Sequence, residues 1–102
     1  MTAYLLSQVE VIDEEAWQNY RSRAAVAIEK FGGRYLARGV HPEVVEADWE
    51  PPGADNQVVV IVEFPSLEAL HAWYQSPEYA AAFAFRGKAV HRRLLFVDGV
   101  SA

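Results

Sequence analysis

Two charged side chains are candidates for chemistry, Glu63 and Arg38. Glu63 lies near the end of the most apolar run of the chain, 57–64, on the side that also carries Val59 and Ile61. A carboxylate left unpaired among apolar side chains can act as a general base. If Arg38 points the same way from a neighbouring strand, the two side chains would instead form a structural ion pair. We favour the pair and keep Glu63 as a candidate catalytic residue.

Four aromatic side chains gather around a predicted break between two helical segments: Trp73, Tyr74, Tyr79 and Phe83. With Arg38 they are the candidate ligand-binding residues, because an apolar pocket with hydroxyl and indole groups suits a flat organic ligand. The structural alternative is that these rings belong to the helix–sheet core and to a dimer contact. Aromatic side chains at helical spacing usually have that structural role, so we favour it.

The three histidines, His41, His71 and His91, are far apart in the sequence. None has the i, i+4 partner that would place two imidazoles on one helical face, so we predict no metal site. His41 lies in a predicted turn, where it could act as a proton shuttle, and it is the second candidate catalytic residue. The chain has no cysteine, which excludes disulfides and cysteine nucleophiles.

The elements that must position these residues follow from hydrophobic periodicity. Alternation of apolar and polar residues predicts five extended segments: 3–11, 33–38, 43–48, 57–64 and about 92–98. Asp13 is expected to cap a helix that ends at Gly32-Gly33, and an apolar stripe runs along it from Trp17 to Phe31. Ser66 and Ser76 are expected to cap two further helical segments, the second reaching Arg86. A surface loop is predicted over 49–56.

This order predicts an α+β fold of the ferredoxin-like split βαβ type, an antiparallel sheet with two helices on one face, as one domain over 1–102. The other sheet face would carry a set of apolar side chains: Leu6, Leu36, Val59, Ile61 and Leu95. A face this apolar should not remain in water. We therefore expect a homodimer, in which two sheets pack face to face as a dimeric α/β barrel.

Three segments together resemble one bacterial family. They are the first strand with Asp13, Glu15 and Tyr20; the run from Gly32 to Gly39; and the run from Glu63 through Ala72-Trp73-Tyr74 to Tyr79. The chain is similar there to the family called domain of unknown function 1330, in the dimeric α/β-barrel superfamily. His41-Pro42 and the 49–56 loop depart from the family pattern. The resemblance implies fold and dimer. The superfamily also contains cofactor-free monooxygenases, lactone isomerases and haem-degrading enzymes, but a shared fold does not transfer a function.

Composition excludes several classes of function. The net charge of −5 argues against nucleic acid as a partner. The basic stretch Arg86, Lys88, Arg92 and Arg93 is expected to be a solvated helix end and strand edge. No apolar run approaches the roughly 20 residues of a membrane span, and no signal peptide is visible, so we expect a cytoplasmic protein without a membrane partner.

Two functions fit these observations, and whether the chain is an enzyme stays open. The first is a dimer that binds a small apolar or aromatic metabolite in a pocket between helix and sheet, with no cofactor. The second is a cofactor-free enzyme, monooxygenase- or isomerase-like, that removes a proton from an activated carbon acid. Glu63 or His41 would then be the base, and Arg38 or Trp73 would stabilise the oxyanion. Haem binding through His41 or His71 is a weaker third possibility.

Overall fold

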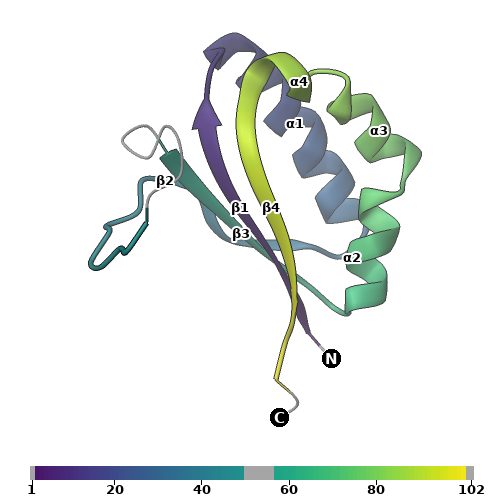
Figure 1. Ribbon diagram of the computed structural model, residues 1–102. Helices are drawn as coiled ribbons and strands as arrows, with labels where there is room; N and C mark the ends of the chain where they lie inside the picture. The colour runs from purple at the N-terminus through teal and green to yellow at the C-terminus, as the bar shows by residue number, and fades with distance from the viewer. Residues whose placement is uncertain (1, 50–56, 101–102) are drawn as a thin grey trace.

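A four-stranded antiparallel sheet carries all the helices on one of its faces (Figure 1). The computed structural model describes residues 2–49 and 57–100. Its elements in chain order are β1 (Ala3–Val11), α1 (Glu14–Lys30), β2 (Arg34–Val40), β3 (Gln57–Phe64), α2 (Leu67–Tyr74), α3 (Pro77–Phe83), α4 (Arg86–Ala89) and β4 (Val90–Asp98). The strand order is β2-β3-β1-β4. This confirms the predicted α+β, ferredoxin-like class.

The predicted helix caps are confirmed. The side chains of Asp13, Ser66 and Ser76 each accept a hydrogen bond from the backbone N–H three residues further on, at 3.1, 3.0 and 3.0 Å. Gly32 ends α1 with a φ of +82°, a left-handed conformation that glycine adopts without steric cost. The helix after Ser76 is shorter than expected: α3 ends at Phe83, and Arg86 begins the separate helix α4.

The core lies between α1, α2, α3 and one sheet face. On β1 the buried residues alternate with less buried ones, so that Ala3, Leu5, Ser7 and Val9 face the helices. The helical contribution is the predicted stripe of α1, whose buried members are Trp17, Tyr20, Ala24, Ala27 and Ile28. No helix within the described ranges is long and apolar enough to cross a membrane.

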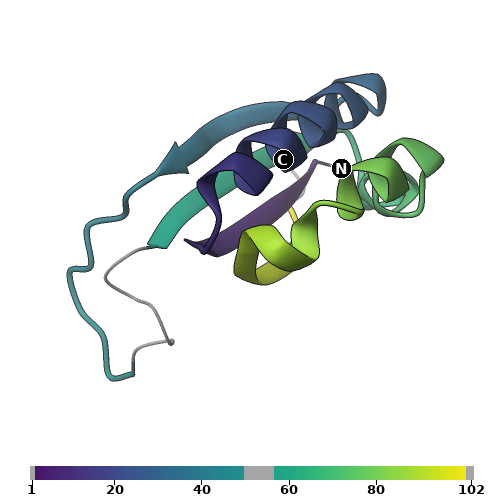
Figure 2. The ribbon, with the colours of Figure 1, turned by 90° about the horizontal axis from the view of Figure 1, so that it is seen from above.

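The predicted strand over 43–48 is wrong. Residues 41–47 form neither helix nor strand, and the chain from 41 to 49 extends away from the sheet (Figure 2). Every side chain of that segment is exposed, Val44 and Val45 included. Two apolar residues could not hold a strand there, because a strand needs a neighbour to pair its backbone groups. Most of the predicted 49–56 loop lies outside the described residues.

We call the sheet face opposite the helices the open face. Its middle is one row of directly paired apolar residues across all four strands: Ala37, Ile61, Leu6 and Leu95. Ion pairs flank that row, with Arg34 bound to Glu63 on one side and His91 to Glu10 on the other. Leu95 is 39% exposed. The predicted apolar second face is therefore present in Leu6, Val59, Ile61 and Leu95, and the same face also carries Arg93, which pairs with Gln8.

Candidate ligand pocket

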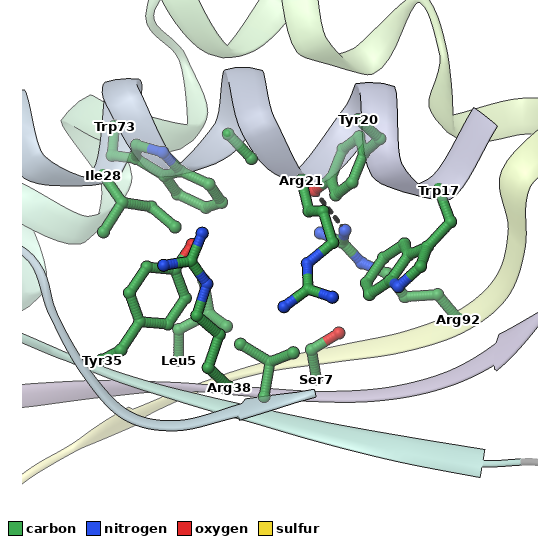
Figure 3. Close-up of a pocket in the computed structure, with 12 residues that line it drawn as sticks. Leu5, Ser7, Trp17, Tyr20, Arg21, Ile28, Tyr35, Arg38, Trp73 and Arg92 are labelled. Carbon is green, nitrogen blue, oxygen red and sulfur yellow. Dashed lines mark hydrogen bonds between the residues drawn. The ribbon is translucent and has the colours of Figure 1, made fainter. Parts of the chain in front are cut away.

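A cavity of about 40 Å³ lies between α1 and the sheet (Figure 3). It opens beside the exposed side chain of Arg38. That volume holds two or three water molecules, at roughly 15 Å³ each. The twelve residues that line it are Leu5, Ser7, Trp17, Tyr20, Arg21, Ala24, Ile28, Tyr35, Arg38, Val60, Trp73 and Arg92.

Local sequence rules explain most of this lining. Residues 17, 20, 21, 24 and 28 of α1 recur at three- and four-residue steps, and they share the helical face toward the sheet. Leu5 and Ser7 are successive inward residues of β1. Trp73 comes from α2 and is 1% exposed.

Arg38 reaches the cavity through an irregularity in β2. The register shifts between Tyr35 and Ala37, so that Tyr35 pairs with Val62 and Arg38 with Val60. Both partners face the helices. A β-bulge of this kind inserts one residue and reverses the alternation beyond it. Arg38 therefore leaves the face that strict alternation from Arg34 assigns to it.

The expected ion pair between Arg38 and Glu63 is consequently wrong. Arg34 occupies the position opposite Glu63, and its guanidinium donates to both carboxylate oxygens at 3.3 and 3.4 Å. Glu63 lies on the open face as predicted, but its side chain is 31% exposed rather than enclosed. The sheet separates this carboxylate from the cavity.

Two buried polar atoms of the cavity lining have no hydrogen-bond partner among the described residues: the Ser7 hydroxyl and the Trp73 indole nitrogen. Ser7 is 4% exposed. Leaving such a group unpaired typically costs about 1–3 kcal/mol. Native structures satisfy nearly all buried polar groups, so the Ser7 hydroxyl and the Trp73 indole N–H are available to a further partner, water included.

Three arginines line the cavity, and within the described residues none of them forms an ion pair with a carboxylate. Each lies over an aromatic ring instead, with guanidinium-to-centroid distances of 5.6 Å for Arg21 and Trp17, 4.5 Å for Arg38 and Tyr35, and 5.3 Å for Arg92 and Tyr20. Cation–π contacts leave the N–H groups of a guanidinium free to donate in its plane. Glu14 and Glu29 line hollows next to the cavity, not the cavity itself.

Arg92 was expected to be solvated, and this is wrong. It is partly buried on the helix side of β4, where it donates hydrogen bonds to the hydroxyls of Tyr20 and Tyr79, the latter at 3.0 Å. Burial alone would lower the pKa of Arg92, but the two phenol oxygens outweigh this effect and raise it. The guanidinium therefore stays charged.

The phenols of Tyr79 and Tyr35 stay protonated. Burial raises the pKa of Tyr79, and it raises the pKa of Tyr35 in spite of the nearby Arg38 and Arg21. Phenols, guanidiniums, an indole and a hydroxyl all supply hydrogen-bond donors. Among the residues that the structure describes, no carboxylate or imidazole lines the cavity. As built, the cavity offers donors and apolar walls but no general base.

The predicted ligand-binding residues fall into two groups. Arg38 and Trp73 line the cavity together. Tyr74 and Phe83, 43% and 48% exposed, lie in a separate outer hollow with Tyr79, on the far side of Arg92. The ring of Trp73, in the cavity, contacts the ring of Tyr79, in the outer hollow, with centroids 4.4 Å apart.

The candidate base His41 is exposed and lies beside the cavity, not in it. Its Nδ1 is 3.1 Å from the carbonyl oxygen of Gln57. It lines an adjoining hollow that shares Trp17 and Arg21 with the cavity. His71 contacts Phe96 edge to face.

Ser7, Arg21, Tyr35 and Arg92 line the cavity and were not predicted. A sequence signal existed for Arg92, because alternation places it on the same face of β4 as Leu94 and Phe96, which are partly buried. Arg21 follows Tyr20 on the apolar stripe of α1. Alternation predicts that Tyr35 lies on the helix side of β2. It does not predict that Arg38 contacts the Tyr35 ring.

The sheet order and the helix-covered face define the class of protein: this is the ferredoxin-like α+β fold of the dimeric α/β-barrel proteins. Within that class the chain belongs to the family described as domain of unknown function (DUF1330), whose model matches residues 2–100. The predicted family is thereby confirmed. No match was found among the curated proteins.

Solved structures of low sequence identity share the fold. A protein of unknown function from Rhodopseudomonas palustris, RPA0582, is 21% identical with a TM-score of 0.78, over 99% of this chain and 84% of that one. SnoaB, a cofactor-independent oxygenase from Streptomyces nogalater, is 12% identical with a TM-score of 0.69, over 99% and 95%. Rv0793 from Mycobacterium tuberculosis is 15% identical with a TM-score of 0.59, over 100% and 98%.

Proposed function

We propose that this chain is a ligand-binding protein that takes a small aromatic molecule into the cavity between α1 and the sheet. The observation that carries the proposal is the pair of unpartnered polar atoms, on Ser7 and Trp73, at a cavity with apolar walls. Binding sites for small molecules are mostly apolar with a few placed polar groups, and this cavity has that composition.

A ring can enter only if the mouth widens. The cavity of about 40 Å³ is smaller than a benzene-sized ligand requires. Arg38 is exposed, and its long side chain has many rotamers of similar energy, so it can swing outward at low cost. The ring would then lie among Trp73, Ile28 and Tyr35.

The test uses two planar probes of the same size, benzoate and benzamide, titrated into the protein labelled with ¹⁵N. The indole N–H of Trp73 gives its own signal, assigned with a Trp73→Phe variant. We expect either probe to shift this signal in a saturable way. The indole signal of the exposed Trp49 should not change with probe concentration. If neither probe moves the Trp73 signal at millimolar concentration, the proposal is wrong.

We propose further that the protein is a homodimer joined through the open face. The centre of that face is apolar and its ion pairs lie toward the margins, the arrangement typical of protein interfaces. A second copy of the chain is the occupant that fits, because a two-fold axis lets the same apolar row meet itself. The fold shared with dimeric α/β-barrel proteins supports the same arrangement.

The enzymatic alternative has less support. Glu63 is on the opposite side of the sheet from the cavity and is paired with Arg34, so it cannot serve a substrate held there. His41 is the candidate base that remains, since its hollow adjoins the cavity. The likeness in fold to an oxygenase such as SnoaB does not by itself transfer an activity.

A further inference from the structure

We infer that the ligand of this cavity is a carboxylate, a flat apolar body bearing one anionic group, and that Arg21 and Arg38 hold that group at the mouth. This inference rests on the proposed function and names the class of ligand. It goes beyond a preference for aromatic molecules, because it assigns a charge to the ligand and a role to two arginines.

The first argument is the distribution of charge. The chain has 14 acidic and 9 basic residues, counting lysine and arginine. Nevertheless, within the described part of the chain, three arginines and no acidic residue line this one cavity. In a protein with net charge −5, this cavity is a local region of positive charge. A cleft with walls of low dielectric concentrates that field and attracts an anion.

The second argument is the number of unused donors. Arg21 and Arg38 make ring contacts, but they donate no hydrogen bond to a carbonyl, carboxylate or hydroxyl oxygen among the described residues. Both guanidinium groups point into the space between α1 and the sheet (Figure 3). A guanidinium presents parallel N–H groups that match the two oxygens of a carboxylate.

The third argument is position. Arg21 comes from α1 and Arg38 from the bulge of β2, so the two cations approach the mouth from opposite walls. Arg92 lines the cavity from β4, and each of its two terminal nitrogens already donates one hydrogen bond, to Tyr20 and to Tyr79. A carboxylate at the mouth would therefore bind Arg21 and Arg38, while its apolar body faces Trp73.

The experiment compares benzoate with benzamide, which differ in charge but hardly in shape. Dissociation constants are measured from the Trp73 indole signal for the wild type and for Arg21→Gln, Arg38→Gln and Arg23→Gln. Arg23 is the matched control: it is an exposed arginine of α1 that lies over Phe85 and does not line the cavity. Thermal unfolding of each variant checks that it is folded.

We expect wild-type protein to bind benzoate at least about tenfold more tightly than benzamide, since a charge-assisted hydrogen bond contributes roughly one such factor. Arg21→Gln and Arg38→Gln should each remove most of that preference and change benzamide binding less than about twofold. Arg23→Gln should behave as wild type. Added salt should weaken benzoate binding more than benzamide binding.

Two results separate this inference from the proposed function. Equal affinities for the two probes, with the Trp73 signal shifted by both, would overturn the anionic ligand and leave the pocket intact. No binding of either probe would overturn both. A benzoate preference that Arg23→Gln reduces as much as Arg21→Gln and Arg38→Gln do would show general attraction by surface charge, and the assigned role of the two arginines would be wrong.

Discussion

The hydroxyl groups of Tyr20 and Tyr79 lie 3.0 Å apart, and both accept hydrogen bonds from Arg92. These residues belong to α1, α3 and β4, so three elements meet in one polar network within the core. The rings of Tyr20 and Tyr79 also contact edge to face. Tyr20 and Arg92 of this network line the cavity, and Arg92 is partly buried.

Removing one hydroxyl from this network should destabilise the fold. We expect Tyr79→Phe to lower the free energy of unfolding by about 1 kcal/mol, because Arg92 loses one acceptor in a buried site. Urea unfolding at fixed protein concentration measures it. Tyr74→Phe is the matched control, since that ring is 43% exposed, and it should stay within about 0.5 kcal/mol of wild type. Equal losses in both variants would contradict the structural role of the network.

The same phenol should make stability depend on alkaline pH. Burial raises the pKa of Tyr79 above the ordinary 10.0 of tyrosine. As the pH rises past 10.0, the unfolded chain loses this proton while the folded chain retains it, so the folded state binds more protons there. The stabilising contribution is thus fully present below that pH and falls above it.

Unfolding by urea at several values between about pH 9 and pH 11 tests this. Stability should decline across the interval, and Tyr79→Phe should decline less steeply, by up to about 1.4 kcal/mol per pH unit. Parallel curves for the two proteins would show that Tyr79 does not carry the effect.

Charge placed in the middle of the open face should separate the dimer. Leu95→Lys puts an ammonium group in the central apolar row, where the partner copy would have to bury it unpaired. We expect sedimentation to report a dimer for wild type and a monomer for Leu95→Lys at micromolar concentration. Val26→Lys on α1, at a position 69% exposed, should remain dimeric. A monomeric wild type would refute the interface outright.

Gly33 should tolerate no side chain. A Cβ there would lie 2.5 Å from Cγ2 of Ile28 and 3.0 Å from Cζ of Phe64, so Gly33→Ala should cost about 2 kcal/mol or more through overpacking. A Cβ added at Gly87, which lies in α4, would meet no other atom within 4 Å. Gly87→Ala should be neutral or stabilise by up to about 1 kcal/mol. Thermal melts of the two variants decide this, and equal melting points would contradict the contacts.

The elements of the fold were largely predictable because their signals are local. Alternation located β1 and β3, and the capping side chains of Asp13, Ser66 and Ser76 located the starts of three helices. The apolar second face followed from the same alternation. The segment 43–48 shows the limit of this reasoning, since residues such as Val44 and Val45 favour a strand but pair with no strand among the described residues.

The cavity was decided by tertiary structure. An irregularity in β2 moved Arg38 to the helix side, and the pairing register of β2 with β3 placed Arg34 opposite Glu63. Arg92 is held on β4 by phenols that come from two other elements. Spacing along a chain determines which side chains share a face of one element. Which faces meet, and in what register, depends on pairing between distant segments, and the three arginines came together through that pairing.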